Sequence, residues 1–189
     1  NAAVLALLKP VGEFGIIKTQ SFRPLGITLV PTKVNEERRE VIEFNNMPAA
    51  VAYARALGVS VEEAPKRFMH NPVGLVTGDD FFVRSPRKIE GESILFYCMV
   101  KEGMDLALLE STDIVADTRK AVEEKVRQLG GASALINFHC ILRALELEEI
   151  GHNEAYGSIF ADIPTIGFST YGEEYIGHIN QTSTMLLFK

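Results

Sequence analysis

The strongest constraint on the fold comes from the final third of the chain, where two strand-like segments flank a helical stretch. Residues 134–139 and 163–170 are short and apolar, whereas residues 141–161 have the periodicity of one or two helices. A connection of this length predicts that the two strands point in the same direction. A short Gly-rich turn over residues 171–177 then predicts that a final strand, residues 179–188, returns antiparallel to them.

The earlier part of the chain adds mainly strands. Four strand-like segments, separated by turns rich in Pro, Gly and Asn, cover residues 2–8, 13–19, 27–34 and 39–44. A predicted meander follows, with a hairpin of segments 73–77 and 81–84, an apolar central strand over 92–100 and a strand over 105–109. We therefore expect an α+β fold with a mixed, mostly antiparallel β-sheet flanked by helices.

Two further helices are marked by the residues at their ends. Pro48 suits the first turn of a helix that Gly58 ends. Either Ser111 or Thr112 is expected to cap a longer helix, which Gly130 closes.

Composition and charge exclude several classes of function. The net charge is −6 and no basic run occurs, which predicts that nucleic acid is not a partner. The longest apolar runs are too short to cross a bilayer, so no membrane association is expected. The two cysteines indicate a reducing compartment, so we expect a cytoplasmic location. Neither a metal-ligand spacing nor a Gly-rich phosphate loop is present, and no cofactor is predicted.

Polar residues gather at one end of the strands predicted in the final third. The strand over residues 134–139 becomes polar only at its carboxyl end, with Asn137 and His139, and then delivers Cys140 to the start of a helix. Residues 169–171 (Ser-Thr-Tyr) end the next strand in the same way, and residues 180–184 begin the returning strand. Open α/β sheets bind ligands beyond the carboxyl ends of their strands, so this rim is a candidate small-ligand site.

Arg143 adds a charge argument to this rim. It lies in the first turn of the helix that follows Cys140, where a cation is mildly unfavourable and an anion is favoured. A carboxylate partner would resolve the conflict, because Arg grips a carboxylate with two hydrogen bonds. Glu173 or Glu174 supplies that carboxylate internally, or a bound ligand does; the sequence leaves both open.

The same residues also have simpler structural interpretations. Cys140 is either a nucleophile activated at a helix start or a small buried hydrophobe, and the second is the commoner use of a free cysteine. His139 is a poor base for it, since neighbouring residues of an extended segment point to opposite faces. Ser169 lacks the glycine pattern of a hydrolase serine, and residues 146, 148, 149 and 154 are interpreted as a solvated acidic helix face. We therefore expect a binding protein rather than an enzyme.

Four segments of the chain resemble the C-terminal domain of FIST proteins: residues 81–86 (FFVRSP), 137–143 (NFHCILR), 167–173 (GFSTYGE) and 178–182 (HINQT). The resemblance covers about residue 47 to the end. The opening strands, with RPLG at 23–26 and EFNN at 43–46, resemble the close of the FIST N-terminal domain. The resemblance thus implies that residues 1–46 finish an upstream FIST N-type domain and residues 47–189 form a FIST C-type domain, which would explain the abrupt start at Asn1.

The resemblance also implies a function. FIST proteins are intracellular, chiefly bacterial sensory proteins in signal transduction. They are thought to bind small molecules, amino acids above all, and to work with histidine kinases, cyclic-dinucleotide enzymes or chemotaxis components. Two other functions stay open: a protein-interaction module, as in F-box proteins with FIST-type domains, and a thiol enzyme that uses Cys140.

The candidate ligand site combines both lines of reasoning. The positions that match the family are Cys140, Arg143, Tyr171, Gly172, Glu173, Asn180 and Thr182. Asn137 and Ser169, from the predicted strand ends, complete the set. One departure is His139, because the family often has Asn before the cysteine.

Overall fold

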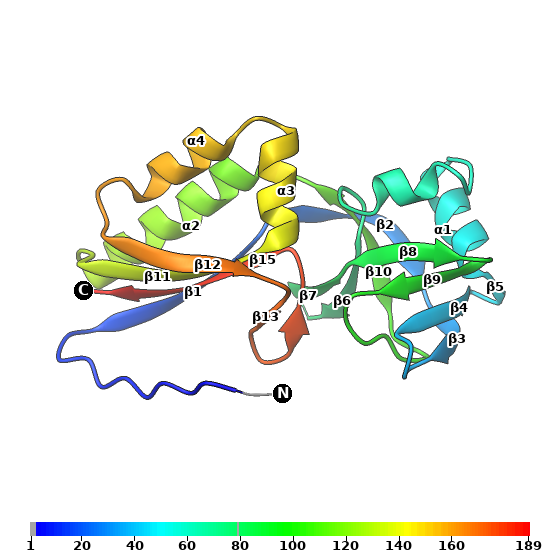
Figure 1. Cartoon of the computed structure of the whole chain (residues 1–189), viewed down its shortest axis with the longest axis horizontal. Coiled ribbons are helices and arrows are strands. Elements are labelled where there is room, and N and C mark those ends of the chain that lie inside the picture. The colour runs from blue at the N-terminus through cyan, green and yellow to red at the C-terminus, as the bar shows by residue number, and fades with distance from the viewer. Residues whose placement is uncertain (1–2, 79) are drawn as a thin grey trace.

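The computed structural model describes residues 3–78 and 80–189, which form two halves side by side along the longest axis (Figure 1). We call the half on the left the α3 half. It contains strands β1 (Phe14–Gln20), β11 (Ala134–Cys140), β12 (Thr165–Thr170) and β15 (Thr182–Phe188), helices α2 (Ile114–Leu129), α3 (Ile141–Glu149) and α4 (Asn153–Gly157), and the 3₁₀ turn η2 (Ser158–Phe160).

The other half, which we call the α1 half, is built from two sheets and one helix. Its strands are β2 (Phe22–Leu29), β3 (Pro31–Asn35), β4 (Glu40–Phe44), β5 (Met47–Pro48), β6 (Val73–Thr77), β7 (Asp80–Arg84), β8 (Pro86–Glu90), β9 (Ser93–Phe96) and β10 (Leu106–Ser111), with helix α1 (Ala49–Leu57) and the 3₁₀ turn η1 (Ala64–Arg67). A small ribbon of β13 (Glu173–Glu174) and β14 (His178–Ile179) lies where the halves meet (Figure 1).

The four-stranded sheet of the α3 half has the order β1-β15-β11-β12. Strands β11 and β12 are parallel, which confirms the directions predicted from the long helical connection. Strand β15 is antiparallel, also as predicted, but it inserts between β1 and β11 instead of pairing with β12. Figure 1 shows the helices on one side of this sheet only.

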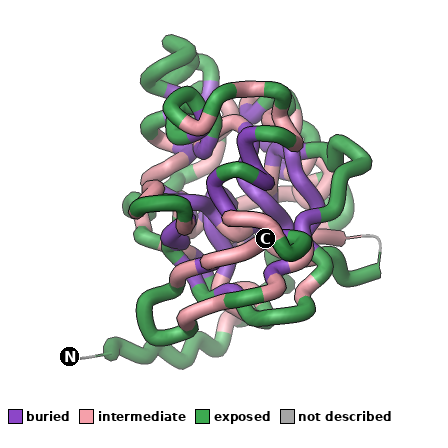
Figure 2. The backbone as a smooth tube through the Cα atoms, turned by 90° about the vertical axis from the view of Figure 1, so that its right-hand side faces the viewer, coloured by how far each residue is buried: buried purple, intermediate pink, exposed green. Residues whose placement is uncertain are grey.

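The α1 half has one large apolar core and a smaller cluster of Phe22, Val83, Ala107 and Leu109. Its two sheets have the orders β2-β10-β6-β7 and β3-β4-β9-β8. Helix α1 packs Tyr53 and its small alanines against them, together with buried residues such as Phe44, Ile94 and Leu108. Figure 2 shows these buried segments in the interior. Gly58, at φ 67°, ends the helix as predicted, because a left-handed residue there satisfies the last carbonyl groups.

Three local predictions are corrected by the structure. Asp113, rather than Ser111 or Thr112, caps α2, and its carboxylate accepts from two backbone N–H groups at 2.9 Å. The apolar run over 92–100 forms a strand only at 93–96 and then bends at Tyr97. Residues 3–8 form no strand, and residue 2 lies outside the described residues.

The α+β prediction is confirmed, with mostly antiparallel sheets. Strands from the first 46 residues belong to the same sheets as later ones: β1 pairs with β15, β2 with β10 and β4 with β9. These pairings join segments on both sides of residue 46, and the domain boundary there stays a prediction. Among the described residues, no helix has both the length and the apolar character needed to span a membrane.

Candidate functional site

The strand registers bring the three polar segments of the final third to one end of the sheet. His139 lies opposite Ser169 on β12 and Ser183 on β15, and Cys140 lies opposite Thr170. The rim expected from the strand ends therefore exists. It faces the α1 half, at the start of α3 (Figure 1).

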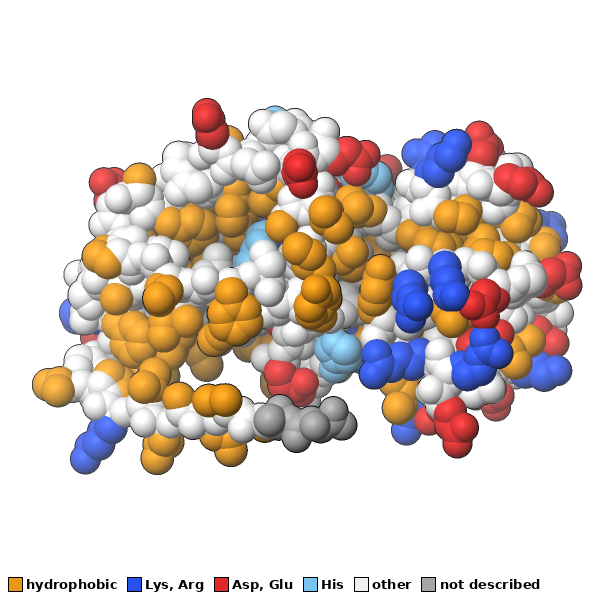
Figure 3. All heavy atoms as spheres, in the orientation of Figure 1, with side chains coloured by type: hydrophobic (Ala, Val, Ile, Leu, Met, Phe, Trp, Pro, Cys, Tyr) orange, Lys and Arg blue, Asp and Glu red, His pale blue; other side chains and the backbone are white. Residues whose placement is uncertain are grey.

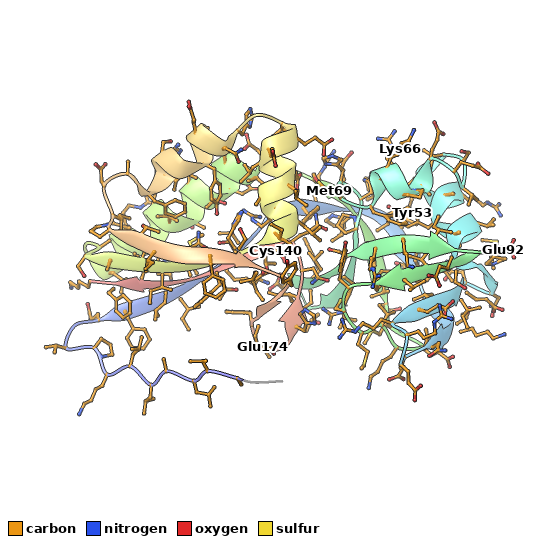
Figure 4. The ribbon with its side chains drawn as sticks, in the orientation of Figure 1. Tyr53, Lys66, Met69, Glu92, Cys140 and Glu174 are labelled. Carbon is orange, nitrogen blue, oxygen red and sulfur yellow. The ribbon has the colours of Figure 1, made fainter. Side chains whose placement is uncertain are left out.

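A cavity of about 200 Å³ opens at this rim. Its lining residues come from three places, namely the bend after β9 (Tyr97), the start of α3 (Cys140, Ile141, Leu142, Leu145) and the segment after β12 (Tyr171, Asn180). Figure 4 shows Cys140 at the start of α3, with Met69 of the α1 half across from it. None of the described lining residues is charged, and most of the lining is aliphatic or aromatic.

The segment of residues 178–181 ties this cavity to the α1 half. The backbone N–H of Asn180 donates to the carbonyl of Val83 at 3.2 Å, and the Asn180 side chain accepts from the N–H of Ser85 at 3.4 Å. Gln181 donates to the carbonyl of Met69 and accepts from the Ser85 hydroxyl, both at 2.7 Å. Asn180 is therefore held by hydrogen bonds to Val83 in β7 and to Ser85 just after it.

Gly172 allows the turn before this segment to pack closely. Its φ is 143°, and a Cβ at this position would lie 2.1 Å from Nε2 of His178 and 3.2 Å from Nδ2 of Asn180. A side chain here would be strained and would displace both neighbours. Gly172 is thus required for the close approach of the turn to residues 178–180.

Glu173 is buried on the far side of the same turn. The hydroxyl groups of Thr170 and Thr182 donate to its carboxylate, and the backbone N–H of Thr182 donates at 3.3 Å. Burial raises the pKa of Glu173, although these hydrogen bonds and the charge of Arg143 act in the opposite direction. Glu173 and Gly172 line a second hollow, of about 330 Å³, together with Phe138, Thr170, Glu174 and Thr184.

Arg143 lies outside both hollows. It is fully buried, and its Nη2 donates to the hydroxyl of Thr118 on α2 at 2.9 Å, which places it on the helix-covered side of the sheet. Its Nε and Nη1 have no hydrogen-bond partner, and no carboxylate of the described residues forms an ion pair with it. The expected ion pair with Glu173 or Glu174 is therefore absent from the described structure, and no ligand in the cavity would touch this guanidinium.

Asn137 and Ser169, two further predicted site residues, also lie outside the cavity at the start of α3. Asn137 is buried on the helix-covered side, where it accepts from the hydroxyl of Ser183 at 2.6 Å. Ser169 is exposed on the edge strand β12. Of the nine predicted site residues, the cavity at the start of α3 brings together Cys140, Tyr171 and Asn180.

Cys140 lines the cavity as a buried thiol. Burial raises its pKa, and the negative charge of Glu173 adds to that effect. The thiol is therefore neutral at pH 7, the opposite of what nucleophilic activation needs. Within the part of the chain that the structure describes, no three His, Cys, Asp or Glu side chains cluster closely enough to hold a metal ion.

A family model of the FIST C domain matches residues 49–175, well over half of the chain. The chain belongs to the FIST family. This is a family of sensory, signal-transduction domains. No curated protein and no solved structure matches the chain. The FIST C match includes Cys140 and Tyr171 of the cavity, whereas Asn180 follows it.

Four lining residues of this FIST C domain were not identified from the sequence: Tyr97, Ile141, Leu142 and Leu145. The last three lie on α3, whose buried side holds two charged residues together with Leu147. Arg143 and Glu146 are buried, whereas Leu145 is 43% exposed. The interpretation of Glu146 as part of a solvated face is therefore wrong.

Proposed function

We propose that this FIST C domain is a sensory module that binds a small, uncharged and largely apolar molecule in the cavity at the start of α3. The observation that carries the proposal is the lining itself. Two tyrosine rings and aliphatic side chains surround one fixed amide, that of Asn180. Small-molecule sites typically combine an apolar lining with a few placed polar groups in this manner.

The lining narrows the class of ligand. The sequence suggested an amino acid or another small carboxylate because of Arg143, but that side chain bonds Thr118 behind the sheet. A carboxylate in the cavity would lie beside the α3 N-terminus, and the charge of Arg143, which acts on Cys140 in the lining, would reach it without a direct contact. A neutral ligand with one polar end that reaches Asn180 fits better.

The position of the cavity suggests how binding would be reported. Tyr97 belongs to the α1 half, Leu142 and Leu145 belong to α3, and Asn180 is bonded to the strand and turn at Val83 and Ser85. A ligand that contacts all three favours arrangements in which the halves are close together. A ligand shifts a conformational equilibrium by its difference in affinity for the two states, so such contacts support a sensory role.

A thermal-shift screen tests this proposal. The ligand panel holds neutral aromatic and branched aliphatic amides and alcohols, the matching carboxylates, and free amino acids. We expect neutral apolar members to raise the melting temperature and the Leu145→Trp variant, which fills the cavity, to abolish the shift. Val51→Trp, at a 36% exposed position on α1, is the matched control and keeps the response. A panel without any response, or a shift that persists in Leu145→Trp, would contradict the proposal.

Protein interaction is a second candidate function, and one observation favours it: the helix-free face of the four-stranded sheet exposes Ile166 and Phe168. Exposed apolar patches of this kind commonly mark interaction surfaces.

We also propose that the signal passes to a histidine kinase, a cyclic-dinucleotide enzyme or a chemotaxis component, as the family resemblance implies.

We propose that the domain is not an enzyme. The raised pKa of Cys140 argues against thiol chemistry. Labelling with iodoacetamide over a pH series checks this point. We expect a thiol that reacts slowly up to pH 8.5, and rapid labelling at pH 6 would support an enzyme instead.

A further inference from the structure

The four-stranded sheet has one bare face, which we call the open face. Helix α2 and the turn η2 cover the other face, against Ile17, Leu135, Met185 and Leu187. The strand registers align the side chains of the open face into adjoining rows: Phe14 with Phe188; Ile16, Leu186, Ile136 and Ile166; and Phe138 with Phe168. Several of these are more than half exposed, with Ile166 at 73% and Phe168 at 65%. Figure 3 shows a hydrophobic patch on this side of the molecule.

The sequence of these strands is that of a sheet covered on both sides. Phe14-Gly15-Ile16-Ile17 in β1 and Met185-Leu186-Leu187-Phe188 in β15 are continuous apolar runs. A sheet with one face in water instead alternates apolar and polar residues. Phe138 and Phe168 also pack edge to face at 5.4 Å, and their rings extend the surface to the edge strand. The pattern therefore calls for a second covering layer.

The chain carries an apolar segment without a partner beside this face. Residues 3–11, which we call the N-terminal arm, have the sequence AVLALLKPV. Val4, Leu5 and Leu7 are at least 95% exposed. Figures 1 and 2 show the arm as an extended, exposed segment that turns back from the start of β1 and runs along the helix-free side of the sheet.

We propose that the N-terminal arm docks on the open face of its own sheet and supplies that covering layer. The arm begins at the correct place. The carbonyl oxygen of Lys189 lies 3.3 Å from where a Cβ of Gly12 would be, so the arm leaves the sheet beside the end of β15 and next to the row of Phe14 and Phe188. One charged side chain, Lys18, lies at the β1 end of the row of Phe138 and Phe168, where it is already paired with Asp80. The other two rows that the arm would cover hold no charged residue among those described.

The length of the arm suits this path. From residue 12 to residue 5, an extended chain spans about 23 Å. From Phe14 to Phe168 the route crosses three inter-strand spacings and four residues along the strands, a diagonal of about 20 Å. Leu5 therefore reaches the far edge of the open face at Phe168. Because only a few residues link the arm to β1, docking in the same molecule has a high effective concentration, which favours it over capture by a second copy.

The docked arm also accounts for a feature of the sequence. Residues 2–8 have the pattern of a strand, yet residues 3–8 form none in the described structure. A lone strand leaves its backbone and side chains without partners and is not stable in water. When the arm docks, the uncovered apolar face gives its apolar side chains a partner.

Disulfide trapping in the full chain tests the proposal. The Leu5→Cys, Phe168→Cys double variant is oxidised at low protein concentration and run on a non-reducing gel. We expect a fast-migrating intramolecular species in most of the protein. Leu5→Cys with Glu123→Cys, on the exposed side of α2, is the matched control and gives little of it. The native thiols, Cys98 and Cys140, are buried and do not compete.

Other outcomes of trapping overturn the proposal. Disulfide-linked dimers as the main product would mean that a second copy occupies the open face. A protein in which both new thiols stay free and react with maleimide would mean that the arm remains undocked.

A second measurement does not depend on a disulfide. Leu5→Asp with Leu7→Asp places charges on the arm, and we expect a melting temperature about 4 °C lower and at least a twofold rise in fluorescence of a dye that binds exposed apolar surface. Leu25→Asp, at a 37% exposed position on β2, is the control and changes neither. An unchanged dye signal and melting temperature in the arm variant would overturn the docking.

Discussion

The two halves of the molecule bury different kinds of residue. In the α1 half, the core residues are apolar, and two of the buried polar side chains form good hydrogen bonds: the Tyr53 hydroxyl donates to the carbonyl of Asn71 at 2.7 Å, and the Asn71 amide donates to that of Leu109 at 3.0 Å. Arg84 Nε and Ser111 Oγ are buried there without a partner. In the α3 half, the apolar clusters are smaller, and Arg143 and Glu146 are buried with side-chain atoms that have no partner. Among the described residues, more of the buried side-chain atoms without a partner lie in the half that carries the rim.

This difference indicates a division of roles. Unpaired buried polar atoms cost stability, and proteins tolerate them chiefly where function requires them. We infer that the α1 half provides a stable support for residues 178–181. The α3 half is expected to be the less stable of the two and therefore the half that changes conformation when a ligand binds. The following variants test that division.

Matched leucine truncations should show the largest effect. Leu108 in the α1 half and Leu187 in the α3 half are both fully buried. We expect Leu108→Ala to lower the free energy of unfolding by about 4–5 kcal/mol and Leu187→Ala by about 2–3 kcal/mol, because a loosely packed site relaxes around the cavity. Urea denaturation measures both. Equal losses would show that the two cores are packed alike.

Acid should weaken the α3 half through His139. Burial lowers its pKa from the ordinary 6.5 to about 3, and the charge of Arg143 adds to this. Between these two pH values, His139 is therefore protonated in the unfolded chain and neutral in the folded protein. The stability due to neutral His139 is complete above pH 6.5 and is lost as the pH falls toward 3, by at most about 1.4 kcal/mol per pH unit.

Two carboxyl groups of the same half act in the opposite direction. Burial raises the pKa values of Glu146 and Glu173, so in the folded state they bind protons more readily just above their ordinary range. Glu146 and Glu173 are present in both wild type and His139→Phe, so their contribution to the pH dependence cancels when the two proteins are compared. We expect wild type to lose more stability than the variant between pH 7 and pH 4 in urea denaturation. Parallel pH profiles would contradict the burial of a neutral imidazole.

The smallest effect is expected at Arg143. Its replacement by Met removes a buried charge with two unpaired nitrogen atoms and keeps most of the volume. We expect Arg143→Met to raise the free energy of unfolding by about 1 kcal/mol, whereas Lys120→Met, exposed on α2, changes it by less than about 0.5 kcal/mol. A loss above about 2 kcal/mol for Arg143→Met would mean that the guanidinium has an anionic partner in solution.

The sequence predicted those parts of the fold that depend on local signals. Gly58 and Gly130 end their helices at left-handed conformations, and the hairpin of β6 and β7 forms where its turn residues indicated. The insertion of β15 between β1 and β11 was not predicted, because nothing local decides between partners that are equally apolar. The capping of α2 by Asp113 was missed although Asp is a favoured cap; its two polar neighbours were equally plausible.

The candidate site was predictable only where strand ends determine it. The two-residue period placed Cys140 and Tyr171 at the same rim, and the antiparallel return added Asn180. The position of Arg143 was not predictable in this way, because a residue in the first turn of a helix points to either side of the sheet depending on how the helix docks. Tyr97 comes from the other half, and its arrival at the rim follows from tertiary packing alone.

The pairing of β1 with β15 has a consequence for how the chain acquires its structure. The strands β2 to β10 find their sheet partners between residues 22 and 111, so that half can fold while synthesis is still in progress. Among the strands of the four-stranded sheet, β1 is made first, whereas its neighbour, residues 182–188, is made last. β1 therefore lacks its sheet partner until the rest of this sheet has been synthesised, and we expect this long-range pairing to form late.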